Sequence, residues 1–252
     1  MQRYFLNELT STVDINAKMI MMSGDDAHHI INVMRMNVGD SVYVCYHNTT
    51  YLAQITQTLN REVRLQIIDE LKENKELPCI VTLAQGLVRK EKMEEVIDHI
   101  TELGASFYLP VIMTRSNVKL KDEKIDKRQI RLNKIAKEAA EQAHRTKVLE
   151  VKEPISFKEF IKISKEYDLC LVAHVDETNN LYLGDAITDE NKILVLVGPE
   201  GGIDDKEIES LKEAGFKFVS LGKRVLRTEV APSYIMSIIY YKRGNNHETK
   251  NS

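Results

Sequence analysis

The sequence predicts two domains: a small β-rich domain over residues 1–72 and an α/β domain with a mostly parallel sheet over residues 73–252. In the first region, strand-length runs are separated by turn-forming stretches such as HNTT and LNRE. In the second region, apolar strand-length runs alternate with amphipathic helices, which is the pattern of an α/β fold. The polar segment from Leu71 to Pro78 separates the two patterns and is interpreted as a linker.

The elements of the N-terminal domain follow from capping and alternation. A short helix is expected after Ser23 or Asp25, either of which suits an N-cap. Asp25 and Asp26 then lie in the first turn, where acidic side chains complement the helix dipole. Strands are expected over VYVCYH, YLAQITQTL and EVRLQIIDEL, which are residues 42–47, 51–59 and 62–71. Together these runs predict a β-meander.

The α/β domain begins with a buried strand, IVTLAQGLV. The next segment is predicted to be a helix that ends at Gly104, because it carries an apolar stripe at Met93, Val96, Ile97, Ile100 and Leu103. FYLPVIM is interpreted as a strand in which Pro110 requires an edge or a locally unpaired position, since proline has no N–H to donate. A long basic helix is expected over about residues 126–145.

The remaining segments continue the alternation of strands and helices. The ranges expected are a helix at 157–167, strands at 168–175 and 194–198, a helix at 205–215 and a strand at 216–222. The last helix is expected to start near Thr228, a suitable N-cap, because Pro232 fits only in a first turn. Its residues are almost wholly apolar through Ile238 and Ile239, which predicts burial on more than one side, as at a dimer interface.

Charge and hydropathy limit the possible classes of protein. The net charge of −3 argues against indiscriminate nucleic-acid binding, yet residues 111–147 hold 11 Lys and Arg against 5 Asp and Glu, a local net of +6. Such a run suits a bounded contact with a polyanion, although a solvated helix face is its commoner cause. No apolar run reaches the roughly 18 to 20 residues of a membrane span, and the N-terminus lacks a signal-peptide pattern. We therefore expect a cytoplasmic protein.

The residues that bind metals in proteins are poorly arranged for doing so here. The three cysteines, at 45, 79 and 170, form no CxxC pair, which argues against a zinc site or a disulfide framework. His28 and His29 are adjacent, and helical neighbours at i and i+1 do not share a face. We expect no metal site.

The stretch from Leu194 to Ala231 contains two strands that each end in a glycine turn. In a parallel sheet, the loops after such strands form a ligand crevice at the carboxyl ends. The loop GPEGG is a poor phosphate cradle, because Pro199 has no N–H, Glu200 is an anion, and neither GxxxxGK[ST] nor GxGxxG is present. The loop favours a neutral or cationic ligand held by backbone groups, and a tight βα turn without a ligand is the alternative.

GPEGG followed by LGKRVLRTE resembles the signature of the RsmE family of SPOUT-class methyltransferases. Three further blocks resemble the family in its order: AHHIINVMRMNVGD, RKEKMEEVIDHITELGASFYLPVIMTRS and KIAKEAAEQAHR. The resemblance implies a C-terminal trefoil-knot domain that binds S-adenosylmethionine and an N-terminal PUA-like β-barrel that helps to dock RNA. It also implies a homodimer that methylates N(3) of one uridine in 16S ribosomal RNA within the small ribosomal subunit.

The resemblance also implies roles for individual residues. The expected cofactor-binding residues are His174, Leu196, Gly198, Pro199, Glu200, Gly201, Gly202, Leu221, Gly222, Val225 and Leu226. The expected RNA contacts are Arg3, His28, His29, Arg35, Arg89, Lys90, Arg115, Ser116 and Arg145. Arg227 is the candidate for stabilising charge on a uracil carbonyl oxygen, and Glu229 the candidate for accepting the ring proton. The alternative is that these two side chains pair with each other, or that Glu229 only complements a helix dipole.

The sequence departs from the family's pattern at four positions: Leu132, Leu149, Val230 and Pro232. Val230 stands where the family has a threonine, which puts a catalytic hydroxyl at that position in doubt. Three rival functions remain: a SPOUT enzyme that methylates ribose 2′-oxygens, a non-catalytic RNA-binding assembly factor, and a nucleotide-binding α/β enzyme. The chemistry of the GPEGG loop disfavours the last.

Overall fold

The structure is a computed structural model that describes residues 1–116, 118, 125–174 and 181–244. These residues form two compact units. The first contains residues 1–76 together with 140–148, and the second contains 77–139 and the chain from 149 on. The first unit thus includes four residues past 72 and a later segment that no pattern in the sequence associates with it.

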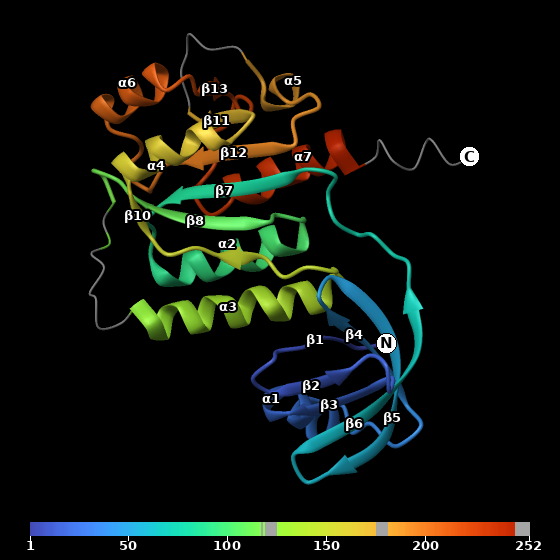
Figure 1. The fold of residues 1–252 in the computed structure, drawn as a ribbon. Coiled ribbons are helices and arrows are strands. Elements are labelled where there is room, and N and C mark those ends of the chain that lie inside the picture. The colour runs from blue at the N-terminus through green and yellow to red at the C-terminus, as the bar shows by residue number, and fades with distance from the viewer. Residues whose placement is uncertain (117, 119–124, 175–180, 245–252) are drawn as a thin grey trace. The chain divides into compact units, whose positions relative to one another are not determined.

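The first unit is a curled six-stranded sheet (Figure 1). Its strands, in spatial order, are β1 (Arg3–Phe5), β4 (Ser41–Tyr46), β5 (Thr49–Leu59), β6 (Glu62–Leu71), β3 (Met19–Ser23) and β2 (Ser11–Asp14). β1 pairs with β4 in parallel, and the other pairs are antiparallel. Two register shifts in the β5–β6 pair increase the local twist. With β1 and β2 as its edges, the sheet is a curled half-barrel, which agrees with the PUA-like domain that the resemblance implies.

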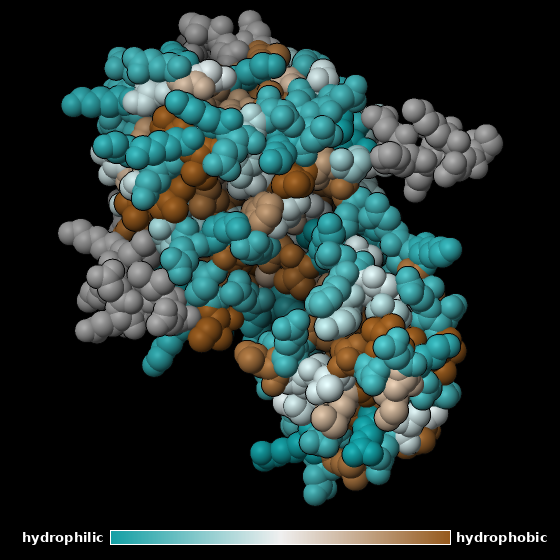
Figure 2. Space-filling model, in the orientation of Figure 1, coloured by the Kyte–Doolittle hydropathy of each residue, from teal (hydrophilic) through white to brown (hydrophobic). Residues whose placement is uncertain are grey.

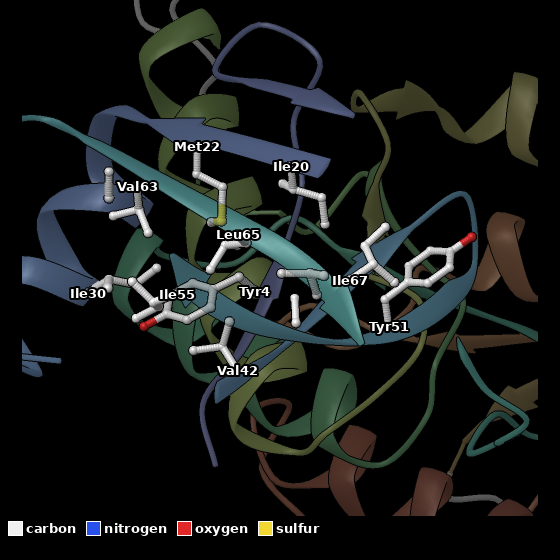
Figure 3. Packing of buried hydrophobic residues seen from close by; sticks show 13 residues of the cluster. Tyr4, Ile20, Met22, Ile30, Val42, Tyr51, Ile55, Val63, Leu65 and Ile67 are labelled. Atoms are coloured by element: carbon white, nitrogen blue, oxygen red, sulfur yellow. The ribbon is translucent and has the colours of Figure 1, made fainter. Parts of the chain in front are cut away.

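The core of this unit comes from alternation along the strands. Figure 3 shows Tyr4, Val42, Ile55 and Leu65 pointing toward one another from four different strands. The predicted helix is present as α1 (Gly24–His28), which continues as a π-helical turn, η1 (His29–Val33). Ser23 is its N-cap residue, but the Ser23 hydroxyl donates to the carbonyl oxygen of Thr10 at 2.9 Å and does not cap the helix.

The predicted linker contributes two carboxylates to the first unit. Glu73 pairs with Arg3, whose Nη2 lies 2.5 Å from Oε1, and Glu76 pairs with Arg145. Glu76 Oε1 also accepts hydrogen bonds from the backbone N–H groups of Thr146 and Lys147, at 2.9 and 3.1 Å. The contacts of Glu76 join the predicted linker to residues 145–147, in agreement with the grouping of residues 140–148 with the first unit.

The second unit is built on a seven-stranded sheet in which every pair of strands is parallel. Its main order is β10 (Ile155–Ser156), β8 (Phe107–Ile112), β7 (Ile80–Gly86), β12 (Lys192–Val197), β11 (Leu169–Ala173) and β13 (Lys217–Val219), with β9 (Glu150–Val151) also beside β8. The predicted parallel sheet is confirmed. Pro110 is in register with Gln85 of β7 on one side. On its other side it lies between the residues of β8 that pair with β9 and those that pair with β10, so it is locally unpaired there, as proline requires.

Helices cover both faces of this sheet (Figure 1). The helices of the unit are α2 (Lys90–Glu102), α3 (Ile125–Gln142, whose last turn groups with the first unit), α4 (Phe157–Ile163) with the 3₁₀ turn η3 (Ser164–Glu166), α5 (Leu183–Ala186), α6 (Asp205–Glu213) and α7 (Ala231–Gly244). Phe160 of α4 and Leu211 of α6 share a core cluster with Ala84 and Leu109. Leu83 and Gln85 alternate with Ala84 along β7 and therefore face the opposite side, where α7 contacts α2 and α5.

The helix α2 confirms the predicted stripe, with Met93, Val96, Ile97 and Ile100 buried. Of the family departures, Leu132 and Leu149 are buried apolar residues that extend the core. Residues 117 and 119–124, which carry part of the predicted basic stretch, lie outside the described residues.

The helix α7 begins at Ala231, three residues later than expected. Thr228 is not its N-cap, because its hydroxyl donates to the carbonyl oxygen of Gly198 at 2.8 Å. Ile235, Met236 and Ile239 are buried, whereas Tyr234 and Tyr241 are exposed on another face.

Hydrophilic side chains cover most of the face shown in Figure 2, with hydrophobic patches between them. In the described part of the chain, no helix has the length and apolar character needed to cross a membrane.

Candidate functional site

A cavity of about 460 Å³ opens at the carboxyl end of the parallel sheet in the second unit. Ala173 pairs with Val197 on one side and with Val219 on the other, so β11, β12 and β13 end at the same level. The loops after these three strands therefore meet around one space. The residues that line the cavity are Lys92, Ala173, His174, Val197, Gly198, Pro199, Glu200, Gly202, Ile203, Val219, Leu221, Gly222, Arg224, Val225, Leu226, Arg227, Thr228, Glu229 and Ala231.

The GPEGG loop packs closely against neighbouring parts of the chain. A Cβ at Gly86, the last residue of β7, would lie 2.5 Å from Cδ of Pro199. A Cβ at Gly201 would lie 2.9 Å from the carbonyl oxygen of Arg115, and one at Gly198 would lie 2.9 Å from Cγ1 of Ile203. Glycine is needed at these positions because the neighbouring chain leaves no room for a side chain.

The RTE segment forms a turn just before α7. Val230 and Ala231 both donate their backbone N–H to the carbonyl oxygen of Arg227, at 3.0 Å. Thr228 is the middle residue of this turn, and its hydroxyl donates a hydrogen bond to the carbonyl oxygen of Gly198 in the GPEGG loop. The two motifs that the sequence singled out are therefore bonded to each other.

Lys92 of α2 connects the two motifs a second time, from across the cavity. Its Nζ lies 3.4 Å from Oε1 of Glu200 and 3.1 Å from Oε2 of Glu229. The adjacent Glu229 carboxylate raises the pKa of Lys92, so the ammonium stays charged at neutral pH. Sequence reasoning missed Lys92, because one lysine on the polar side of an amphipathic helix carries no signal of its own.

Glu229 is an ionised carboxylate held beside a cation. Burial raises its pKa, but backbone N–H donation, Lys92 and Arg227 outweigh burial and leave the pKa below its ordinary value. A carboxyl group with a lowered pKa holds a proton weakly, which makes it a poor general base. The partner of Glu229 in an ion pair is Lys92, whereas the sequence had suggested Arg227 as one alternative.

Most of the predicted cofactor-binding residues line the cavity, with two exceptions. Leu196 lies in β12 and belongs to the core cluster on the α4 and α6 side of the sheet. Gly201 packs against Arg115 and does not line the space. His174, directly after β11, lines the cavity and lies edge-on to the ring of Phe218. The lining residues for which the sequence predicted no role in the site include Lys92, Arg224 and Thr228.

The residues of the first unit that are expected to contact RNA differ in their exposure to solvent. Arg3 and Arg145 are only 2% and 3% exposed and form the buried ion pairs with Glu73 and Glu76. Their guanidinium groups are held by these ion pairs inside the unit, and contact of the two side chains with RNA stays a prediction that their burial does not support. His29 is half-buried, with Nδ1 2.9 Å from the hydroxyl of Tyr4, whereas His28 and Arg35 are exposed.

In the second unit the expected RNA contacts lie at the surface. Arg89 and Lys90 are exposed at the amino end of α2, where Lys90 lies 3.5 Å from Glu94. Arg115 is exposed and lies 3.5 Å from Asp204, and Ser116 beside it is half-buried. These side chains are accessible to a polyanion.

The cavity combines two kinds of wall. Glu200 and Glu229 supply negative charge, Lys92, Arg224 and Arg227 supply positive charge, and Leu221, Val225 and Leu226 supply apolar surface. Its volume lies within the roughly 300 to 1,000 Å³ of small-molecule sites. Such a space fits a ligand that carries charged groups beside a flat apolar part. Among the described residues, no cluster of His, Cys, Asp and Glu could hold a metal ion.

Comparison with known proteins identifies the type of enzyme. Residues 75–240 match the model of an RNA methyltransferase domain, and residues 23–68 match that of an RNA methyltransferase PUA domain. The chain is 37% identical over 249 residues to ribosomal RNA small subunit methyltransferase E of Bacillus subtilis, with 96% of this chain and 97% of the relative covered. It is 31% identical to the enzyme of the same name from Aquifex aeolicus, over 88% of this chain and 93% of the relative.

Solved structures agree with the sequence relatives. A ribosomal RNA small subunit methyltransferase E from Neisseria gonorrhoeae, bound to S-adenosyl methionine, superposes with a TM-score of 0.85 at 28% identity, over 95% of this chain and 97% of that one. A methyltransferase from Legionella pneumophila in complex with the same cofactor gives the same TM-score and identity, over 95% and 96% of the two chains. The protein therefore belongs to the ribosomal RNA small subunit methyltransferase E family of SPOUT-class methyltransferases.

Proposed function

We propose that this protein transfers a methyl group from S-adenosylmethionine to N(3) of one uridine in 16S ribosomal RNA within the small ribosomal subunit. The observation that carries the proposal is the cavity in which the GPEGG loop and the RTE turn are bonded together at the carboxyl end of the sheet. Family membership supplies the reaction class, and the cavity supplies a place for it.

The cavity residues fit the proposed cofactor. Leu221, Val225 and Leu226 offer an apolar wall for the adenine ring, and backbone groups of Gly198 and Gly222 are open to the space. Glu200 and Glu229 offer carboxylates to the positive sulfonium and ammonium groups, and Arg224 offers a cation to the carboxylate of the cofactor. When bound, S-adenosylmethionine supplies a methyl group already activated for transfer.

Arg227 is proposed to stabilise the uracil ring as it loses its N(3) proton. Negative charge then spreads onto the two carbonyl oxygens of the ring, and a guanidinium group can donate two hydrogen bonds to such an oxygen. Arg227 is exposed at the cavity, where an extruded base could reach it. Donors placed where charge develops are among the strongest contributors to catalysis.

Glu229 is proposed to accept a hydrogen bond from the ring N–H and so to orient the base and help to remove its proton. The low pKa that Lys92 and the backbone impose limits how far the carboxylate takes that proton. Arg227 makes the ring more acidic, and the proton passes by way of the Glu229 carboxylate to solvent water, so Glu229 orients the N–H group more than it acts as a strong base.

The RNA and a second copy of the chain are the proposed partners, and the cytoplasm, where ribosomes are assembled, is the proposed location. Exposed cations at Arg89, Lys90 and Arg115 support contact with phosphates, whose binding should weaken steeply with salt. The exposed aromatic face of α7, with Tyr234 and Tyr241, supports a homodimer. Light scattering would test the dimer, and Tyr241→Glu, at a side chain 71% exposed, should weaken it without disturbing the fold.

Mass mapping of modified nucleosides in 16S ribosomal RNA tests the proposed reaction. A strain lacking the gene should lack one N(3)-methyluridine, and a plasmid copy of the wild-type gene should restore it. A copy carrying Arg227→Ala should restore little. A methyl group on a ribose oxygen would show the rival SPOUT reaction, and unchanged RNA in the deletion strain would favour a non-catalytic assembly factor.

A further inference from the structure

A polar pair lies in the interior of the second unit, directly behind the cavity. Gln85, near the carboxyl end of β7, and Tyr108 of β8 are both 0% exposed. The Tyr108 hydroxyl donates to Oε1 of Gln85 at 2.7 Å. Polar side chains in such a place are costly unless they are fully hydrogen-bonded, and apolar residues would fill the same volume without that cost. The pair therefore calls for a role other than filling the core.

From Gln85 the hydrogen bonds continue into the site. Nε2 of Gln85 donates to the backbone carbonyl oxygen of Thr228 at 2.7 Å and to its hydroxyl at 3.0 Å. That hydroxyl in turn donates to the carbonyl oxygen of Gly198 at 2.8 Å. A single chain of hydrogen bonds thus runs from the sheet interior through the RTE turn to the GPEGG loop.

The direction of this chain is fixed. The carbonyl oxygens of Thr228 and Gly198 can only accept, so the Gln85 amide must present its nitrogen to Thr228 and its oxygen to Tyr108. Tyr108 must then donate, and burial raises the pKa of its hydroxyl, which keeps the proton in place. No alternative arrangement of the protons satisfies all four residues, so the chain has one state.

We propose that Tyr108 and Gln85 are positioning residues for methyl transfer: they set the RTE turn, and with it Arg227 and Glu229, at a fixed place relative to the GPEGG loop. The inference rests on the proposed function for the roles of Arg227 and Glu229. Neither Tyr108 nor Gln85 lines the cavity, so both act through Thr228 and Gly198. The network holds the two walls of the cofactor site together before any ligand arrives.

The chain offers a matched pair of substitutions. Tyr108→Phe removes the first hydrogen bond of the network and leaves Oε1 of Gln85 buried without its donor. Tyr167→Phe removes a tyrosine hydrogen bond to the same strand, because the Tyr167 hydroxyl lies 2.9 Å from that of Thr82. Thr82 stands near the amino end of β7, away from the cavity. Both variants lose one hydroxyl beside β7, and only the first touches the network.

Two measurements on the purified protein test the proposal. In the protein without cofactor, Tyr108→Phe should speed amide hydrogen exchange in residues 198–202 and 227–231 by about ten-fold. It should also weaken the binding of S-adenosylhomocysteine, measured by calorimetry, by about ten-fold. This is the size of effect expected when one buried acceptor loses its hydrogen bond. Tyr167→Phe should change neither. The proposal would be overturned if folded Tyr108→Phe had the exchange rates and the affinity of the wild type. It would also be overturned if Tyr108→Phe and Tyr167→Phe lost affinity and protection from exchange equally.

A second pair guards against an unstable Tyr108 variant. Thr228→Ser keeps the hydroxyl that links Gln85 to Gly198, whereas Thr228→Val keeps the shape and loses the link. The serine variant should bind S-adenosylhomocysteine at least about ten-fold more tightly than the valine variant, and equal affinities would contradict the proposal. Neither readout depends on which RNA atom is methylated. A methyl group found on another atom would therefore refute the proposed reaction and leave the positioning role standing.

Discussion

Arg227 and Glu229 are neighbours in one short turn, yet their surroundings fit them for different tasks. Arg227 is exposed and faces the space that a base would enter, whereas Glu229 is half-buried and held by Lys92. A charge that must meet the substrate benefits from access, and one that must keep its orientation benefits from a fixed partner. The proposed division of labour follows from this difference.

Replacing Arg227 tests its role in the transition state. Arg227→Ala should lower kcat by about 10²- to 10³-fold, as for the loss of an oxyanion-hole donor, while affinity for the cofactor changes little. Single-turnover rates on small ribosomal subunits from a deletion strain would measure the effect. Lys223→Ala removes the same charge from an exposed side chain outside the cavity lining and should have a small effect. Equal losses in the two variants would indicate general attraction for RNA.

Replacing Lys92 tests the electrostatics of the cavity. Burial raises the pKa of Glu229 and Lys92 is one of the groups that lower it, so without the ammonium group this pKa should rise from its present lowered value. A carboxylate with a lowered pKa is ionised down to lower pH, so removing Lys92 should move the acidic limb of the kcat/KM profile to higher pH. Lys92→Met should show this shift and Lys92→Arg should largely reverse it. If Lys92→Met had the same pH profile as the wild type, the ionisation of Glu229 would not control the acidic limb.

At the scale of elements, the GPEGG loop depends on contacts that leave no room for a β-carbon. Gly201→Ala should weaken cofactor binding by about 10²-fold, because its methyl group would meet the backbone of Arg115 and displace the loop. Gly215, after α6, differs from Gly201 in having positive φ and open space around it. Gly215→Ala should therefore cost about 1 kcal/mol of stability and leave binding intact. Calorimetry with S-adenosylhomocysteine separates the two effects, and unchanged affinity in Gly201→Ala would contradict this account of the loop.

Periodicity predicted the elements more successfully than it predicted what connects them. The stripe of α2 and the parallel sheet could be read from residue spacing, because burial of one helix face and of whole strands leaves a local pattern. The start of α7 could not, because the Thr228 hydroxyl bonds to Gly198, which is distant in sequence. Lys92 was missed for the same reason: its two partners lie in other segments of the chain.

The RNA contacts show a second limit of sequence reasoning. Arg3 and Arg145 have the residue type that binds phosphate, and only the fold shows that Glu73 and Glu76 occupy them. The acidic partners lie in a segment whose composition indicates a linker. A count of charges along the sequence cannot distinguish an exposed cation from one that is buried in an ion pair.

At the scale of the whole molecule, the Arg145–Glu76 pair should make stability depend on pH. Arg145 and backbone donors lower the pKa of Glu76 against the opposing effect of burial. The folded-state pKa is therefore below the unfolded one, so the stabilisation is present above the unfolded pKa and is lost as pH falls through the folded pKa. Urea unfolding across acidic pH should show a slope that Glu76→Gln reduces.

At neutral pH, Glu76→Gln should cost about 3 kcal/mol, because it leaves a buried guanidinium group without its carboxylate. Glu153→Gln, at an exposed position, should stay within about 0.5 kcal/mol of wild type. If the two variants behaved alike, the ion pair would contribute nothing to the stability of the unit.

The ion pairs of the first unit also constrain the order in which the protein is completed during translation. Chains leave the ribosome from the N-terminus, and domains generally fold as units once they have emerged. Arg3 is made first, its partner Glu73 follows the last strand of the sheet, and Glu76 must wait for Arg145. By the time residue 148 is available, β7, α2 and β8 have emerged as well. The first unit is therefore completed only after part of the second unit has been synthesised. A fragment that ended at residue 72 would bury Arg3 without the carboxylate of Glu73.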